Sequence, residues 1–108
     1  MKHRDIWTRG CAFLPEATRQ LAALRFEDIS KWPEYPGKPY VDLRVPSELS
    51  DVQFTVMKDT QPDGSIRVTI QMYRYRFLGI GAMRADGFFV SPGGAVRWFT
   101  EKDTWAVT

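Results

Sequence analysis

Few side chains in this sequence can do acid, base or nucleophilic chemistry. The single histidine, His3, lies near the first residue, and the single cysteine, Cys11, follows eight positions later. A Cys-His or Ser-His-Asp arrangement would have to recruit that one histidine. One histidine and one cysteine are also too few for a structural zinc site. We therefore expect no catalytic residue, no cofactor and no metal, and we expect Cys11 to be a buried small hydrophobic residue.

Carboxylates are the remaining source of catalytic chemistry. The candidates for an all-carboxylate site are Glu27, Asp28, Asp51, Asp59, Asp63 and Asp86. Each stands beside a turn or helix-cap signal that already accounts for an acidic residue. An enzyme with a carboxylate-based site is therefore the least favoured function.

Side chains suited to binding gather in the second half of the chain. Residues 65 to 100 hold five arginines and one aspartate, a balance of +4, whereas residues 1 to 64 balance at −1. Arginine favours planar, bidentate contacts to carboxylate or phosphate. The candidate partner-binding residues are Arg67, Tyr73, Arg74, Tyr75, Arg76, Arg84 and Arg97. Solvated strand faces and edge protection would account for the same arginines without any partner.

One long strand is expected to position most of these residues. The run 65–78 has the longest period-two alternation in the chain and is rich in β-branched and aromatic residues. Its first apolar residues share one face: Ile66, Val68, Ile70 and Met72. From Tyr73 onward the apolar residues fall on the other face. A β-bulge near Met72 or Tyr73 would keep both sets inside.

The direction of Tyr73, Tyr75 and Phe77 separates three descriptions of the surface. Without a bulge, the three rings lie in a row beside Arg67 and could stack the bases of single-stranded nucleic acid. With a bulge, Arg74 and Arg76 project outward, and with Arg84 or Arg97 they suit an acidic protein surface. In the third description the rings are core residues under a helix and bind nothing.

The first third of the chain predicts an N-terminal helix. Residues 5 to 13 are expected to form a short strand or an extended arm that packs Ile6, Trp7 and Phe13. The helix is expected to enter at Leu14-Pro15-Glu16, with Pro15 at the first helical position, and to run to about Asp28. Its apolar stripe is expected to cover a sheet.

Three prolines follow at intervals of three residues, which is the period of a polyproline II helix. Pro33, Pro36 and Lys38 match the PxxPx(basic) pattern of ligands for aromatic-lined domains. A stiff connector in which Trp32 and Tyr35 cap the core explains the same residues.

Strands and turns fill the rest. Strands are expected at 40–45, 52–58, 65–78, 88–90 and 95–100, with hairpin turns at Pro62-Asp63-Gly64 and Pro92-Gly93-Gly94. Residues 101–104 predict a polar turn or the start of a short helix, and residues 105–107 an apolar clip that folds back.

These patterns predict an α+β fold over residues 1–108 as a single domain, with an N-terminal helix packed on a twisted antiparallel sheet of about five strands. The function that we expect is that of a non-catalytic protein acting on a protein partner through the Arg-rich sheet face. Small inhibitors and immunity proteins share this size and fold class. Single-stranded nucleic acid is the alternative partner. It is less favoured than a protein, because a net charge of +2 is modest for a dedicated nucleic-acid binder.

The expected location is the cytoplasm, without a membrane partner. No window approaches the ~18 apolar residues of a membrane helix, and residues 1–5 lead into no apolar signal-peptide core. A single cysteine fits a reducing compartment. Exposed sheet edges could pair into a dimer, but no sequence feature requires one.

Overall fold

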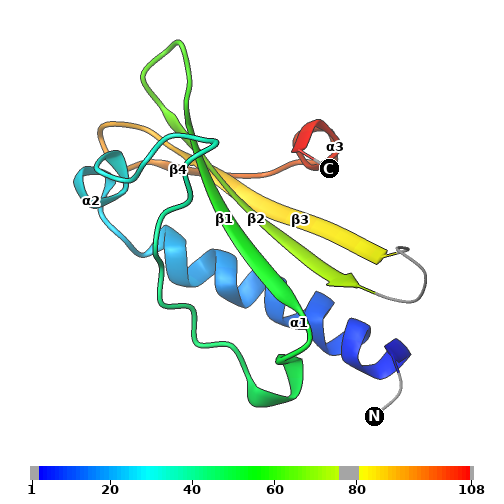
Figure 1. Cartoon of the computed structure of the whole chain (residues 1–108). Coiled ribbons are helices and arrows are strands. Elements are labelled where there is room, and N and C mark those ends of the chain that lie inside the picture. Colours follow the sequence, from blue (N-terminus) through cyan, green and yellow to red (C-terminus); the bar gives the residue numbers. More distant parts are fainter. Residues whose placement is uncertain (1–2, 76–80, 108) are drawn as a thin grey trace.

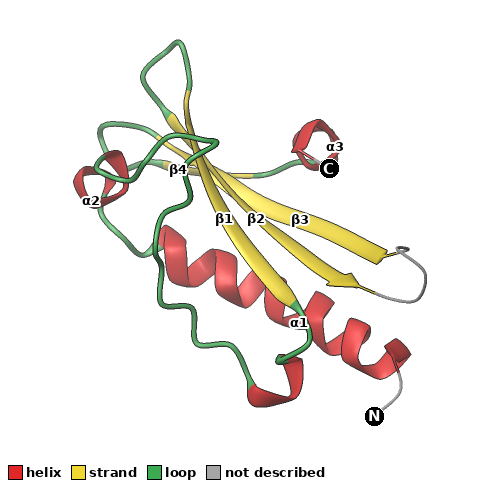
Figure 2. Cartoon of the chain, viewed as in Figure 1, coloured by secondary structure: helices red, strands yellow, loops and turns green. Residues whose placement is uncertain are grey.

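A long N-terminal helix lies across one face of a four-stranded antiparallel sheet (Figure 1). The computed structural model describes residues 3–75 and 81–107. The described elements are α1 (His3–Ala22), α2 (Phe26–Ser30), a 3-10 turn η1 (Ser47–Leu49), β1 (Gln53–Thr60), β2 (Ile66–Tyr75), β3 (Gly81–Val90), β4 (Val96–Trp98) and α3 (Glu101–Val107). The sheet order β1-β2-β3-β4 follows the chain (Figure 2). The α+β class, the N-terminal helix and the antiparallel sheet are confirmed, but the described sheet has four strands instead of about five.

The N-terminal residues form part of α1 instead of the expected strand or arm. The helix runs from His3 through Pro15 to Ala22, and α2 follows as a separate helix. Buried positions recur along α1 at helical spacing: Ile6, Gly10, Phe13, Leu14, Ala17, Thr18 and Leu21. Burial of this stripe offsets the ~3 kcal/mol that a proline costs inside a helix. The predicted entry at Pro15 is wrong because the apolar stripe extends well before the proline.

β2 keeps one unbroken register with both of its neighbours. Met72 pairs with Phe54 and Arg84, and Tyr73 pairs with Gln53 and Met83, so no extra residue enters the strand at this point. The alternative without a β-bulge is therefore the correct one. We call the sheet face that carries Ile66, Val68, Ile70 and Met72 the helix face. The opposite face, with Arg67, Thr69, Gln71 and Tyr73, is the outer face.

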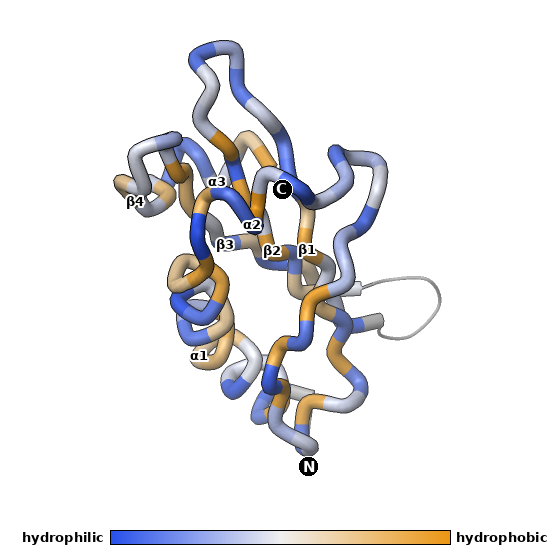
Figure 3. The backbone as a smooth tube through the Cα atoms, turned by 90° about the vertical axis from the view of Figure 1, so that its left-hand side faces the viewer, coloured by the Kyte–Doolittle hydropathy of each residue, from blue (hydrophilic) through white to orange (hydrophobic). Residues whose placement is uncertain are grey.

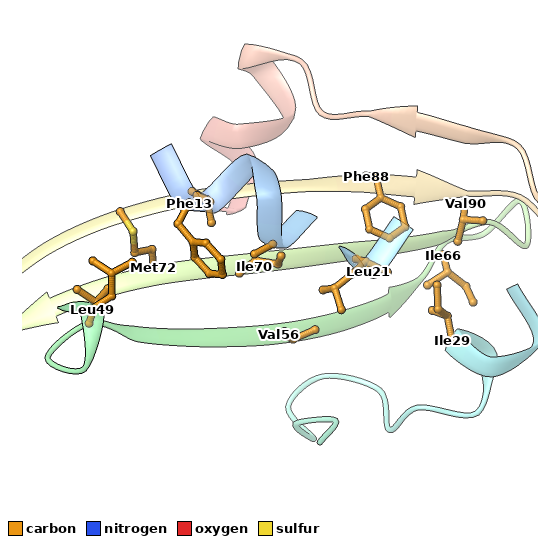
Figure 4. Close-up of a cluster of buried hydrophobic side chains, with 14 of the residues drawn as sticks. Phe13, Leu21, Ile29, Leu49, Val56, Ile66, Ile70, Met72, Phe88 and Val90 are labelled. Carbon is orange, nitrogen blue, oxygen red and sulfur yellow. The ribbon is translucent and has the colours of Figure 1, made fainter. Parts of the chain in front are cut away.

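The hydrophobic core lies between the helix face and α1. The four apolar residues of the helix face on β2 are at most 2% exposed, and Phe88 is fully buried beside them. Leu21 of α1, Ile29 of α2 and Leu49 of η1 close the core (Figure 4). Hydrophobic positions accordingly occur on both α1 and the strands that it faces (Figure 3). Gly10 lets α1 approach the sheet closely, since a Cβ there would lie 2.8 Å from Met72 Sδ.

The expected strand at Tyr40–Val45 is wrong. This segment forms no strand, and its bonds from backbone to backbone are local, such as Val45 N–H to Leu43 O at 2.9 Å, while Arg44 N–H donates to Gln20 Oε1 of α1 at 3.4 Å. Val41 and Leu43 are half-buried against the core while Asp42 and Arg44 are exposed. The alternation of apolar and polar residues therefore indicated only that one side of the segment is buried. A strand also needs a neighbouring strand for its hydrogen bonds.

Both predicted hairpin turns are confirmed. In the first, Gln61 N–H donates to Ser65 O at 2.8 Å, and Gly64 adopts φ +89°. In the second, Ser91 N–H donates to Ala95 O at 3.0 Å, and Gly94 adopts φ +90°. Positive φ is the region that favours glycine, so these two glycines set where the chain reverses.

A buried lysine ties β1 to the segment after α1. The Lys58 side chain is 5% exposed, and its Nζ donates to Ser30 O at 2.8 Å and to Trp32 O at 3.0 Å. Glu34 Oε1 lies 3.2 Å from the same Nζ. Hydrogen bonds from Thr60, followed by the charge of Lys58, lower the pKa of Glu34 below its ordinary value. Trp32 also packs on the core as expected, whereas Tyr35 is 59% exposed.

We predict that Lys58→Met lowers the free energy of unfolding by about 2 kcal/mol, because two partly buried carbonyls lose their donor while the chain length of the side chain is kept. Urea unfolding at neutral pH measures this difference. Lys102→Met, at an exposed lysine of α3, is the control and should change stability by less than about 0.5 kcal/mol. Equal stabilities of the two variants would contradict the role of Lys58.

Candidate functional site

The predicted binding residues do not share one surface. Arg67, Tyr73 and Arg97 belong to the outer face, whereas Arg74 and Arg84 stand at helix-face positions of the register. Tyr75 pairs with Gly81 at the end of β2. Arg76 and Phe77 lie outside the described residues. Tyr73 belongs to the outer face and does not lie in the core under α1. The description of the rings as core residues under a helix is therefore excluded for Tyr73.

Several of the predicted arginines are engaged with carboxylates. Arg67 Nη2 lies 3.1 Å from Asp59 Oδ2, and the Arg67 side chain is 28% exposed. Arg74 Nη2 lies 4.0 Å from Asp51 Oδ2. Arg97 Nη1 lies 3.1 Å from Asp103 Oδ2, and its guanidinium stacks 4.1 Å from the centre of the Phe89 ring. The pairs of Arg67 and Arg97 leave less free positive charge on the outer face than the sequence predicts.

Arg84 differs from the other three described arginine candidates, because its side chain contacts a thiol. Its side chain is exposed, and Nη1 donates to Cys11 Sγ at 3.4 Å. Cys11 is only partly buried, so it is not the fully buried hydrophobic residue that we expected. Both side chains line a groove of about 570 Å³ beside β3.

We call this feature the β3-edge groove. It is lined by residues of α1, β3 and α3: Cys11, Leu14, Pro15, Arg84, Ala85, Asp86, Glu101, Thr104 and Trp105. β4 pairs only with Phe88–Val90, so the preceding part of β3 has no strand partner on this side among the described residues. The groove therefore follows an open strand edge between two helices.

Two exposed tryptophans flank this edge. Trp105 of α3 is 74% exposed and lines the β3-edge groove. Trp98 of β4 is 51% exposed, contacts Phe88 edge-to-face, and lines an adjoining hollow that shares Pro15 and Asp86 with the groove. The expected role of Trp105 in an apolar clip is wrong. No sequence signal separates an exposed tryptophan from a buried one in so short a strand as β4 or so short a helix as α3, and for that reason sequence reasoning missed both residues.

Of the two acidic residues in the groove lining, Asp86 is already engaged. Asp86 Oδ2 accepts a hydrogen bond from Thr18 Oγ1 at 3.0 Å, and Asp86 Oδ1 accepts one from Gly87 N–H at 2.8 Å. These bonds fix the carboxylate as a link between α1 and β3. Among residues 3–75 and 81–107, no group of three or more histidine, cysteine or acidic residues is placed to hold a metal ion.

α3 forms one wall of the groove and is held by a capping box. Thr100 N–H donates to Asp103 Oδ2 at 2.9 Å, and Asp103 N–H donates to Thr100 Oγ1 at 3.3 Å. The hydrogen bonds from Thr100, and then the Arg97 guanidinium, lower the pKa of Asp103 below its ordinary value. At the other end, Gln71 Nε2 donates to Val107 O at 2.9 Å. Of the two expectations for residues 101–104, the helix is correct.

Comparison of the chain with protein-family models, curated proteins and solved structures finds no match. Within the described residues, no helix has both the length and the apolar character needed to cross a membrane.

We predict that Thr100→Ala lowers the free energy of unfolding by about 1 kcal/mol and moves the pKa of Asp103 toward its ordinary value, because the capping hydroxyl is lost. A carboxyl NMR titration and urea unfolding measure the two effects, and Thr100→Ser should preserve both.

The contribution of the wild-type Asp103 carboxylate to the stability of the fold depends on pH in a defined direction. Because its pKa is lowered on folding, its stabilisation is present above the ordinary aspartate pKa of about 3.9 and is lost as the pH falls through the folded value. An unchanged Asp103 titration in Thr100→Ala would contradict the capping role.

Proposed function

We propose that this protein is a non-catalytic binding protein whose partner is another protein, and that the partner binds along the open edge of β3. The observation that carries the proposal is the arrangement of two exposed tryptophans at that edge: Trp105 lines the β3-edge groove together with Arg84, and Trp98 lines the adjoining hollow. Tryptophan and arginine are enriched among the residues that dominate protein–protein binding energy.

The backbone of β3 supplies the second argument. Gly87 O accepts a hydrogen bond from Phe99 N–H on the β4 side. Because N–H and C=O groups alternate in direction along a strand, Met83 and Ala85 aim theirs to the same side. Met83 is 44% exposed, whereas Ala85 is 5% exposed and forms the floor of the groove. An extended segment of the partner can therefore add to β3 at Met83 and send a side chain toward the groove.

The charges around the groove also suit a protein better than a nucleic acid. Glu101 and Asp86 lie in the same lining as Arg84, so the surface has mixed sign. Nucleic-acid binding depends on several unpaired cations that contact phosphates, and Arg67 and Arg97 are paired with Asp59 and Asp103.

The proposal is tested with two double variants. The immobilised protein is exposed to native lysate under nuclease treatment, and retained proteins are compared between the wild type, Arg84→Ala/Trp105→Ala and a control, Arg44→Ala/Tyr40→Ala. The control removes an exposed arginine and an aromatic residue that is 94% exposed, both remote from β3 in the chain. We expect the wild type and the control to retain the same proteins and the Arg84/Trp105 variant to lose them.

A further variant separates pairing at the strand edge from contact with the groove alone. Met83→Lys places a charge on the open edge, which disfavours strand addition, and it should weaken capture of the same proteins. No protein retained, or equal retention by all variants, would contradict the proposal. Retention that is seen only when nuclease is omitted, or that falls steeply with salt, would instead indicate nucleic acid. Concentration-dependent dimers abolished by Met83→Lys would indicate a second copy of this chain.

A further inference from the structure

The charges of the β3-edge groove are mainly negative. Its described lining holds the carboxylates Asp86 and Glu101 and one cation, Arg84, which gives a balance of −1. Across residues 3–75 and 81–107, neither of these carboxylates has a lysine or arginine nitrogen within 4.0 Å. The groove therefore presents two acidic groups that no cation of the described chain neutralises.

Asp86 is held in place by neutral donors. The half-buried carboxylate accepts hydrogen bonds from the Thr18 hydroxyl at 3.0 Å and from Gly87 N–H at 2.8 Å. A carboxylate can accept about four hydrogen bonds, so each oxygen of Asp86 can accept another. Partial burial of a charge without a countercharge is unfavourable, and a cation supplied by a partner would relieve that cost. Because the side chain is already fixed, binding would not have to order it.

Trp98 lies next to Asp86 on the sheet. Trp98 pairs with Phe88 on the helix face, so Asp86, two residues before Phe88, is its diagonal neighbour across the strands. Diagonal positions are about 7–8 Å apart, within reach of an aromatic side chain. Both residues line the adjoining hollow, where the one cation, Arg19, is already paired with Glu16 at 2.8 Å.

α3 repeats this combination of an acid and an indole. Glu101 and Trp105 are four residues apart, which places them on the same side of the helix, and both are exposed and line the groove. Asp86 belongs to the linings of both the groove and the adjoining hollow, so it connects the two combinations. Indole rings attract cations. The guanidinium of arginine is planar, stacks on aromatic rings and pairs with carboxylates through two hydrogen bonds.

On the basis of the proposed function, we propose that the partner inserts an arginine side chain into the β3-edge groove. Its guanidinium pairs with Asp86 and Glu101 and stacks on an exposed tryptophan of the groove. The part of the partner that enters the groove is thus basic, whereas the count of arginines in the sequence suited an acidic partner. Arg67 and Arg97 contributed to that count, but both are paired with carboxylates of this chain.

The experiment uses N-acetylarginine amide as the probe and follows the indole N–H signals of the whole chain in two-dimensional NMR spectra. We expect saturable shifts for Trp98 and Trp105. The signals of Trp7 and Trp32, which pack against the core, should not move. N-acetylcitrulline amide has nearly the same shape but no charge, and it should bind at least about fivefold more weakly.

Two double variants test the carboxylates. Asp86→Asn/Glu101→Gln should raise the dissociation constant of the arginine probe at least about fivefold. Glu48→Gln/Asp51→Asn removes the same charge at two exposed positions before β1 and should stay within about twofold of the wild type. Glu101→Gln alone changes an exposed side chain outside the core, and it should raise the dissociation constant at least about twofold even if the double variant does not fold.

The proposal is overturned if citrulline shifts the indole signals as strongly as arginine does, or if Glu101→Gln binds the probe as tightly as the wild type. The outcome is distinguishable from that of the proposed function. Proteins retained from lysate without any indole shift by the probe would contradict the arginine site and leave the protein partner. Indole shifts by the probe without any retained protein would contradict the protein partner and leave the guanidinium site.

Discussion

The uninterrupted pairing of β2 is the constraint on which the rest of the structure depends. All ten residues of β2 pair with β3 in one register, and the first eight also pair with β1. Because side chains alternate between the faces of a strand, a slip of one residue would move Ile66, Val68, Ile70 and Met72 away from α1 and bring Arg67 and Thr69 under it. Burial of the four apolar side chains therefore fixes the position of every other residue on both faces.

The β3-edge groove follows from that register. α1 covers the helix face and α3 docks on the outer face, so β3 is left with a helix on each side and an open edge between them. On the helix face the same register places Asp86 diagonally across from Trp98. α3 forms a wall of the groove, although it is only seven residues long. The capping box at Thr100 matters for this reason, since a helix of this length has little stability of its own.

The sequence predicts the parts of this fold whose signals are local. Period-two alternation located β2, and the Pro-Asp-Gly and Pro-Gly-Gly turns located two hairpins. Where a tertiary partner decides the outcome, the local signals failed. α1 passes through Pro15 because its apolar stripe is buried against the sheet, and residues 40–45 alternate without becoming a strand because no strand lies beside them.

The candidate sites were harder to predict for the same reason. Arg84 was among the predicted binding residues, but its neighbours Cys11 and Trp105 come from the two ends of the chain. The ion pairs Arg67–Asp59 and Arg97–Asp103 depend on strand pairing and on the docking of α3, neither of which is visible in a count of charges. Likewise, the position of Asp86 beside Trp98 follows from the register of β4 and not from a motif.

The most direct measurement of the central claim is the set of cross-strand proton contacts around Met72 in solution. Nuclear Overhauser effects between backbone protons report which residues face each other across an antiparallel pair. The continuous register predicts contacts for the pairs Phe54–Met72, Met72–Arg84 and Tyr73–Met83 with no shift along β2. Contacts displaced by one residue after Met72 would reveal a bulge, turn Tyr73 toward α1, and contradict the division of the sheet into the two faces described.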